Sequence, residues 1–170
     1  MTALTSLSPC TENPILEYNR LIQSNEIPAC AKLKAMYAML AKDIQEPRDT
    51  WEYDEQRAQH AITFIERYCK HSKGKWGGKP VVLELWQRAF VAAAFGFVNV
   101  ETGFRRFQDV LLVVARKNGK STLSSAIALY LMIADGEAGA EVYAAATKKD
   151  QAKIVWLEAK RMVKKSPALI

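Results

Sequence analysis

The sequence predicts an α/β fold in which helices flank a parallel sheet and further helices precede it. A β-branched apolar run at 109–115 and a second predicted strand at 141–146 are each followed by a helical stretch, at 120–134 and 148–165. This alternation is typical of a parallel sheet, because parallel strands need a crossover helix between them. The hydrophobic fraction of 49% in 170 residues is sufficient for one packed domain.

Helices are also predicted upstream of this alternation. Apolar residues recur at helical spacing over 33–44 and again over 58–69. A third, largely buried helix is expected over 83–98, where small and aromatic apolar residues predominate. Residues 1–14 contain two prolines and no periodic pattern, which favours a loose N-terminal tail.

Composition narrows the functional classes. The formal charge of +6 gives mild support for a polyanionic partner. Three cysteines and two histidines match neither a disulfide scaffold nor a familiar zinc pattern. The start of the chain does not resemble a secretory signal, and its longest apolar runs are far shorter than the ~20 residues that span a bilayer. We therefore expect a cytoplasmic protein that has no membrane partner.

Two basic segments of the sequence each allow more than one functional interpretation. Residues 70–79 combine four lysines with three glycines and Trp76, which indicates an exposed loop. This loop is interpreted either as a contact for DNA phosphate or as an ordinary solvated loop. Arg105 and Arg106 lie in a predicted turn, which is interpreted either as a contact for DNA or an adjacent subunit or as a plain solvated turn.

The most informative feature is Gly119-Lys120-Ser121, which follows a buried run directly and opens a helix. Backbone N–H groups and the positive end of the helix dipole attract nucleotide phosphates there, Lys120 can reach them, and the Ser121 hydroxyl can ligate Mg²⁺. The general motif also requires glycine at position 114, where this chain has Val114. A basic turn that only caps a helix therefore remains an alternative.

A resemblance to a known family accounts for this departure. Residues 115–122, ARKNGKST, resemble the variant Walker A loop of phage terminase large subunits, which commonly lacks the first glycine and carries an arginine four residues before the lysine. Residues 83–87, LELWQ, resemble the adenine-recognition segment of that family, and 142–152 resemble the strand and helix that follow its phosphate loop. The likeness extends from about Asn25 to Val163.

The resemblance implies roles for particular residues. Arg116 corresponds to an arginine at the γ-phosphate and is expected, with Lys120, to be catalytic. Trp86 and Gln87 are expected at the adenine, although Trp86 fits a core position slightly better. The phosphates of ATP are expected at Asn118, Gly119, Lys120, Ser121 and Thr122, and Mg²⁺ at Ser121.

The resemblance also implies a fold type and a function. The family has an additional-strand P-loop ATPase that drives double-stranded viral DNA into a procapsid, coupled to a nuclease. Expected partners are double-stranded DNA, the terminase small subunit, the portal protein and further copies of the chain, in the bacterial host cytoplasm. The Walker B strand and the nuclease are expected beyond Ile170, so the isolated 170-residue chain should be inactive. A helicase-like P-loop ATPase and a non-catalytic remnant remain alternatives.

The domain organisation that follows is a flexible tail at 1–24, a helical region at 25–80 and the first part of the ATPase core at 81–170.

Overall fold

The computed structural model describes residues 12–170 and contains six α-helices, two short 3-10 helices and two strands in that range. The helices are α1 (Pro14–Gln23), α2 (Ala31–Gln45), α3 (Glu55–Tyr68), α4 (Leu85–Gly96), α5 (Lys120–Ile133) and α6 (Lys149–Lys165), with η1 (Gly74–Trp76) and η2 (Pro167–Leu169). The strands are β1 (Trp51–Tyr53) and β2 (Phe97–Asn99). None of the helices within 12–170 is long and apolar enough to cross a membrane.

The first helix corrects the expected tail. Residues 1–11 lie outside the described residues, but α1 occupies most of the remaining part of the predicted tail at 1–24, which is therefore wrong there. Asn13 Oδ1 accepts a hydrogen bond from the Ile15 N–H at 2.9 Å and caps the helix, and a proline stands at its start. The buried residues of α1 are Ile15, Tyr18 and Ile22. This apolar side packs on α2 and α4.

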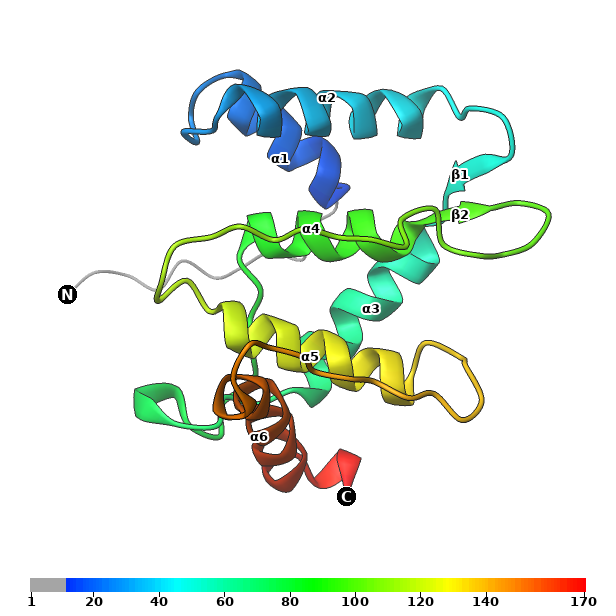
Figure 1. The fold of residues 1–170 in the computed structure, drawn as a ribbon. Coiled ribbons are helices and arrows are strands. Elements are labelled where there is room, and N and C mark those ends of the chain that lie inside the picture. Colours follow the sequence, from blue (N-terminus) through cyan, green and yellow to red (C-terminus); the bar gives the residue numbers. More distant parts are fainter. Residues whose placement is uncertain (1–11) are drawn as a thin grey trace.

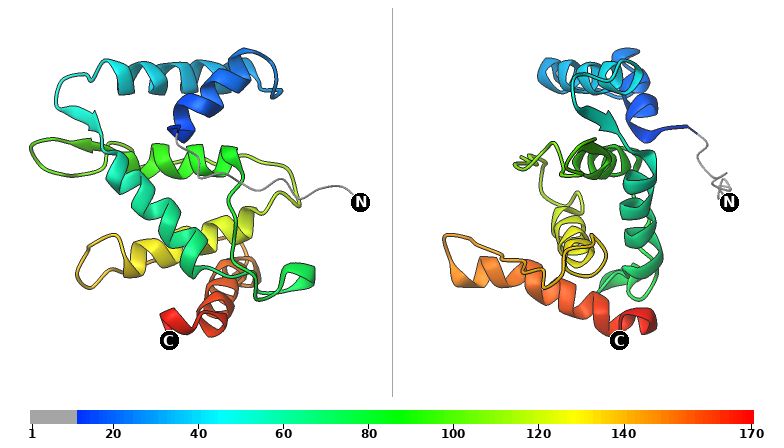
Figure 2. Two further views of the ribbon diagram at one scale, coloured as in Figure 1. Left: turned by 180° about the vertical axis from the view of Figure 1, so that it is seen from behind. Right: turned by 90° about the vertical axis from the view of Figure 1, so that its right-hand side faces the viewer.

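The other predicted helices are confirmed, and they stack in layers (Figures 1 and 2). α1 and α2 lie at one end, α4 and α5 follow, and α6 closes the other end, while α3 packs across both α4 and α5. One hydrophobic core runs from Ile15 to Met162 and is continuous across the expected boundary at residue 80. The residues upstream of that boundary therefore share one core with α5.

The predicted parallel sheet is not formed by the described residues. The sheet found among them is an antiparallel pair of β1 and β2, with Trp51 opposite Asn99. Segments 109–115 and 141–146 have no strand assignment. Leu111 is 87% exposed, whereas Leu112 packs on the core, so one side of the first segment covers the helices and the other faces outward. A strand requires a hydrogen-bonded neighbour, and no other described segment provides one.

Arg105 and Arg106 are both held in ion pairs, so they do not lie in a plain solvated turn. Arg106 and Arg48 bind opposite oxygens of the buried Asp43 at 2.8 and 2.7 Å, which ties α2 to the segment after β2. Burial alone would raise the pKa of Asp43, but its hydrogen bonds and charge interactions with both arginines outweigh burial and lower this pKa. Arg105 binds Asp135 at 2.8 Å, beyond the end of α5.

Candidate phosphate-binding site

The loop before α5 has an unusual backbone. Lys117 and Gly119 both have φ of +70°, in the left-handed region, and Gly119 is the N-cap residue of the helix. Glycine adopts this conformation without steric penalty, whereas a lysine there is uncommon and tends to occur at functional sites. The two left-handed residues turn the chain sharply between the extended segment and the helix.

The N-terminus of α5 is open to an anion. Its first intrahelical hydrogen bond joins the Leu123 N–H to the Gly119 carbonyl at 2.9 Å, so the N–H groups of Lys120, Ser121 and Thr122 have no acceptor within the helix. No side chain caps this end, and the first turn contains no acidic residue. The positive end of a 14-residue helix is therefore available to a negatively charged ligand.

The side chains of the loop point to the same chemistry. Lys120 Nζ donates a hydrogen bond to the Val114 carbonyl at 3.2 Å, so the lysine folds back over the loop from the first residue of the helix. Residue 114 contributes its backbone carbonyl here, a group that valine supplies as well as glycine does. Asn118 Nδ2 donates to the Ala115 carbonyl at 3.4 Å and closes the turn. Arg116 is exposed on the same loop.

The structure brings Gln87 to this loop. Gln87 lies in the first turn of α4, and α4 and α5 begin on the same side of the molecule (Figure 1). A β-carbon built on Gly119 would lie only 3.3 Å from Gln87 Nε2. Gln87 Oε1 accepts a hydrogen bond from the Glu84 N–H at 3.0 Å, which fixes the amide and leaves its NH₂ group toward the loop. Trp86 is partly buried and packs against the core, as the core interpretation expects.

Glu84 holds the Gln87 amide through its backbone N–H, a role that the sequence reasoning did not single out. Its spacing of three residues from Gln87 is that of a capping box. Ser121 is exposed and Thr122 partly buried in the first turn of α5. Within residues 12–170, no group of three His, Cys, Asp or Glu side chains could hold a metal ion. Of the residues expected at the site, Gln87 and the 116–122 loop thus lie next to each other. Trp86 packs against the core beside Gln87.

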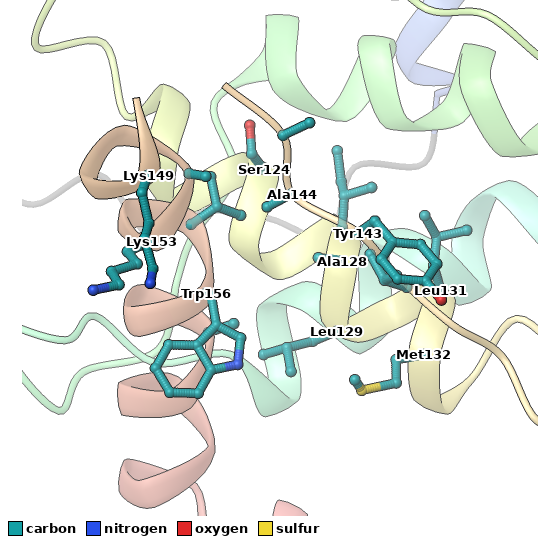
Figure 3. Close-up of a pocket in the computed structure, with 16 residues that line it drawn as sticks. Ser124, Ala128, Leu129, Leu131, Met132, Tyr143, Ala144, Lys149, Lys153 and Trp156 are labelled. Carbon is teal, nitrogen blue, oxygen red and sulfur yellow. The ribbon is translucent and has the colours of Figure 1, made fainter. Parts of the chain in front are cut away.

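A separate apolar hollow of about 620 Å³ lies between α5 and α6 (Figure 3). Tyr143 and Ala144, from one of the unpaired segments, line it together with Met132 and Trp156. No residue of the 116–122 loop borders it, nor does Gln87. Its lining is mostly aliphatic and aromatic, so we interpret it as a packing surface and not as the phosphate site.

Comparison with known proteins identifies the family. The family model for the terminase large subunit, ATPase domain, matches residues 85–170. The terminase large subunit of Enterobacteria phage HK97 is 32% identical over 114 residues, which make up 66% of this chain and 21% of that protein. The crystal structure of the HK97 bacteriophage large terminase is similar with a TM-score of 0.54 and 29% identity, over 66% of this chain and 22% of the other.

This chain thus spans about a fifth of the length of these relatives. The matched residues include the open N-terminus of α5, the loop before it and Gln87. The chain belongs to the terminase large subunit family, in the region of its ATPase domain.

Proposed function

We propose that this chain binds ATP with its phosphates at the N-terminus of α5 and its adenine beside α4. The observation that carries the proposal is the uncapped start of α5, which has free N–H groups beside both Lys120 and the buried Gln87. An ammonium group next to free backbone N–H groups binds polyphosphate. The Gln87 NH₂ group can donate to the base, since its carbonyl oxygen is already engaged by Glu84.

The first turn of α5 also fits Mg²⁺ bound together with the nucleotide. The Ser121 hydroxyl is exposed there, and phosphate oxygens and water would complete the shell of a hard cation. The ion would neutralise charge on the phosphates. Arg116, exposed on the same loop, is the cation that we assign to the γ-phosphate.

We further propose that the whole protein is the ATP-driven motor that packages double-stranded viral DNA into a procapsid. Family membership supports this role. It would act as a homo-oligomer with the terminase small subunit and the portal protein, in the cytoplasm of the bacterial host. Segments 109–115 and 141–146 would then pair with further strands in a parallel P-loop sheet. Because this chain covers about a fifth of its relatives, we expect it to hydrolyse ATP negligibly by itself.

The proposal is tested by calorimetric titration of an ATP analogue with Mg²⁺ into the chain and its Lys120→Ala variant. We expect the variant to lose nucleotide binding while keeping its fold, because it removes an exposed phosphate contact and no core volume. Lys117→Ala removes the same charge from the same loop and serves as the matched control, which should retain most of the affinity. A folded Lys120→Ala protein with unchanged affinity would refute the site. If the unmutated chain does not bind the ATP analogue at all, the result would favour a non-catalytic remnant.

A further inference from the structure

The positive charge of this chain is concentrated in two short segments. Residues 67–83 and 159–170 contain nine of the 24 lysines and arginines and none of the 18 acidic residues. The rest of the chain therefore has fifteen basic and eighteen acidic residues. The net charge of +6 thus arises entirely from these two segments, which lie far apart in the sequence.

The fold places the two segments side by side. The loop that follows α3 lies next to α6 in both Figure 1 and Figure 2. Ser72 Oγ in this loop donates a hydrogen bond to Glu158 Oε1 of α6 at 2.6 Å, and both residues are buried. A β-carbon built on Gly77 would lie 3.5 Å from Lys165 Nζ. Glu158 also forms an ion pair with Arg161 at 3.9 Å, so it offsets the charge of that arginine and leaves the lysines of the loop and Lys165 without an acidic partner from it.

The loop itself has a defined backbone. The His71 N–H binds the Lys79 carbonyl at 2.9 Å, and the Gly78 N–H binds the His71 carbonyl at 2.8 Å. Lys75 and Lys79 place their ammonium groups 5.2 and 5.0 Å from the centre of the Trp76 ring. The tryptophan is half exposed, but two cations lie over it, so it presents positive charge and not an open stacking face.

Helical spacing adds further cations to the same side. Lys165 lies seven residues, or two turns, after Glu158, so it is on the face of α6 that contacts the loop, and Lys164 precedes it. We define the basic surface as Lys73, Lys75, Lys79 and Lys165, because Arg161 on the same face is paired with Glu158.

We propose that the basic surface binds the phosphodiester backbone of double-stranded nucleic acid. This proposal rests on the proposed function: it assigns to the DNA a contact that is separate from the loop before α5. Four neighbouring lysines with no acidic residue among them fit a line of phosphates. The ammonium groups of Lys75 and Lys79 over the Trp76 ring disfavour single strands, which bind chiefly by stacking bases on open aromatic faces. Contacts to phosphate alone make the binding independent of base sequence.

The test is fluorescence anisotropy of a labelled 30-base-pair duplex titrated with the chain at several salt concentrations. We compare Lys73→Ala/Lys75→Ala/Lys79→Ala with the control Lys32→Ala/Lys34→Ala/Lys42→Ala, which removes the same charge from α2 at the far end of the molecule. Each lost phosphate contact lowers the slope of log K against log salt by about 0.9, so the loop variant should lose roughly 2.7 from the slope. The control should keep the parental slope and affinity.

Further arms separate the alternatives. The labelled single strand of the same sequence should bind more weakly than the duplex, and vesicles containing anionic lipid should not compete with the duplex at equal phosphate. Equal losses of duplex affinity and salt slope in the two triple variants would overturn the proposal. Tighter binding of the single strand or effective competition by vesicles would also overturn it. The loop variant should still bind the ATP analogue, because the basic surface includes no residue of the phosphate loop. Failure of nucleotide binding in the parent chain would leave the duplex result intact, so the two proposals fail separately.

Discussion

Replacing Gly119 by alanine tests the geometry of the phosphate loop. Alanine at a φ of +70° has an energetic cost of about 1–2 kcal/mol, because its β-carbon crowds the following carbonyl. The new β-carbon would also lie 3.3 Å from Gln87 Nε2, closer than ordinary van der Waals contact. The amide must shift to make room, which strains the hydrogen bond that it accepts from the Glu84 N–H and adds about 0.5–1.5 kcal/mol.

Gly139 provides a matched control within the same chain. Its φ is +73°, and a β-carbon there would meet no atom within 4 Å. Gly139→Ala should therefore lower the free energy of unfolding only by the backbone cost, about 1–2 kcal/mol, and Gly119→Ala should lower it by about 1.5–3.5 kcal/mol. Urea denaturation followed by circular dichroism measures both free energies of unfolding.

The contact with Gln87 is isolated by a double-mutant cycle. In a Gln87→Ala background the additional loss on Gly119→Ala should disappear, which gives a coupling of about 0.5–1.5 kcal/mol. Nucleotide affinity should fall in Gly119→Ala and remain unchanged in Gly139→Ala. Equal destabilisation by the two glycine substitutions, together with zero coupling, would refute the proximity of Gln87 to the loop.

Three further outcomes are expected. Gln87→Ala should weaken ATP binding by about 1 kcal/mol and leave GTP binding nearly unchanged, and equal effects in calorimetry would exclude an adenine contact. Burial raises the pKa of the Cys69 thiol to about 12, so in a Cys10→Ser/Cys30→Ser protein it should react with a thiol reagent at neutral pH only on unfolding, and rapid labelling of the native protein would contradict this. The folded pKa of Asp43 is lowered, so its ionisation stabilises the fold above the unfolded pKa of about 3.9, and this stabilisation disappears as the pH falls through the folded value. Urea midpoints between pH 5 and 2 should fall more steeply in the parent than in Asp43→Asn, and parallel curves would contradict the assignment.

Local signals predicted the helices well. The helical spacing of apolar residues over 33–44 and 58–69 corresponds to α2 and α3, because each buries one face against the core. The position of the loop before α5 was also predicted from the sequence, since glycine, lysine and a hydroxyl at a helix start form a local motif. The first helix was missed because its cap, Asn13, and its three buried positions lie among polar residues that resemble a tail.

Long-range features required the tertiary structure. The two extended segments have strand-like sequences, yet a strand forms only when another segment pairs with it, and the described residues provide none. The sequence left the contacts of Arg105 and Arg106 open, and folding brings Asp135 and the buried Asp43 to them. Such ion pairs join residues that are distant in sequence, so no local pattern reveals them.

The sequence by itself determined the helical faces, the phosphate loop and the resemblance to a terminase ATPase, because each depends on residues close together in the chain. Only the tertiary structure decided that Gln87 lies beside Gly119 and that the loop at 70–80 joins α6 into one basic surface. The physical reason is that packing of α3, α4, α5 and α6 sets these distances. Burial of apolar faces drives that packing, and it fixes which distant segments become neighbours.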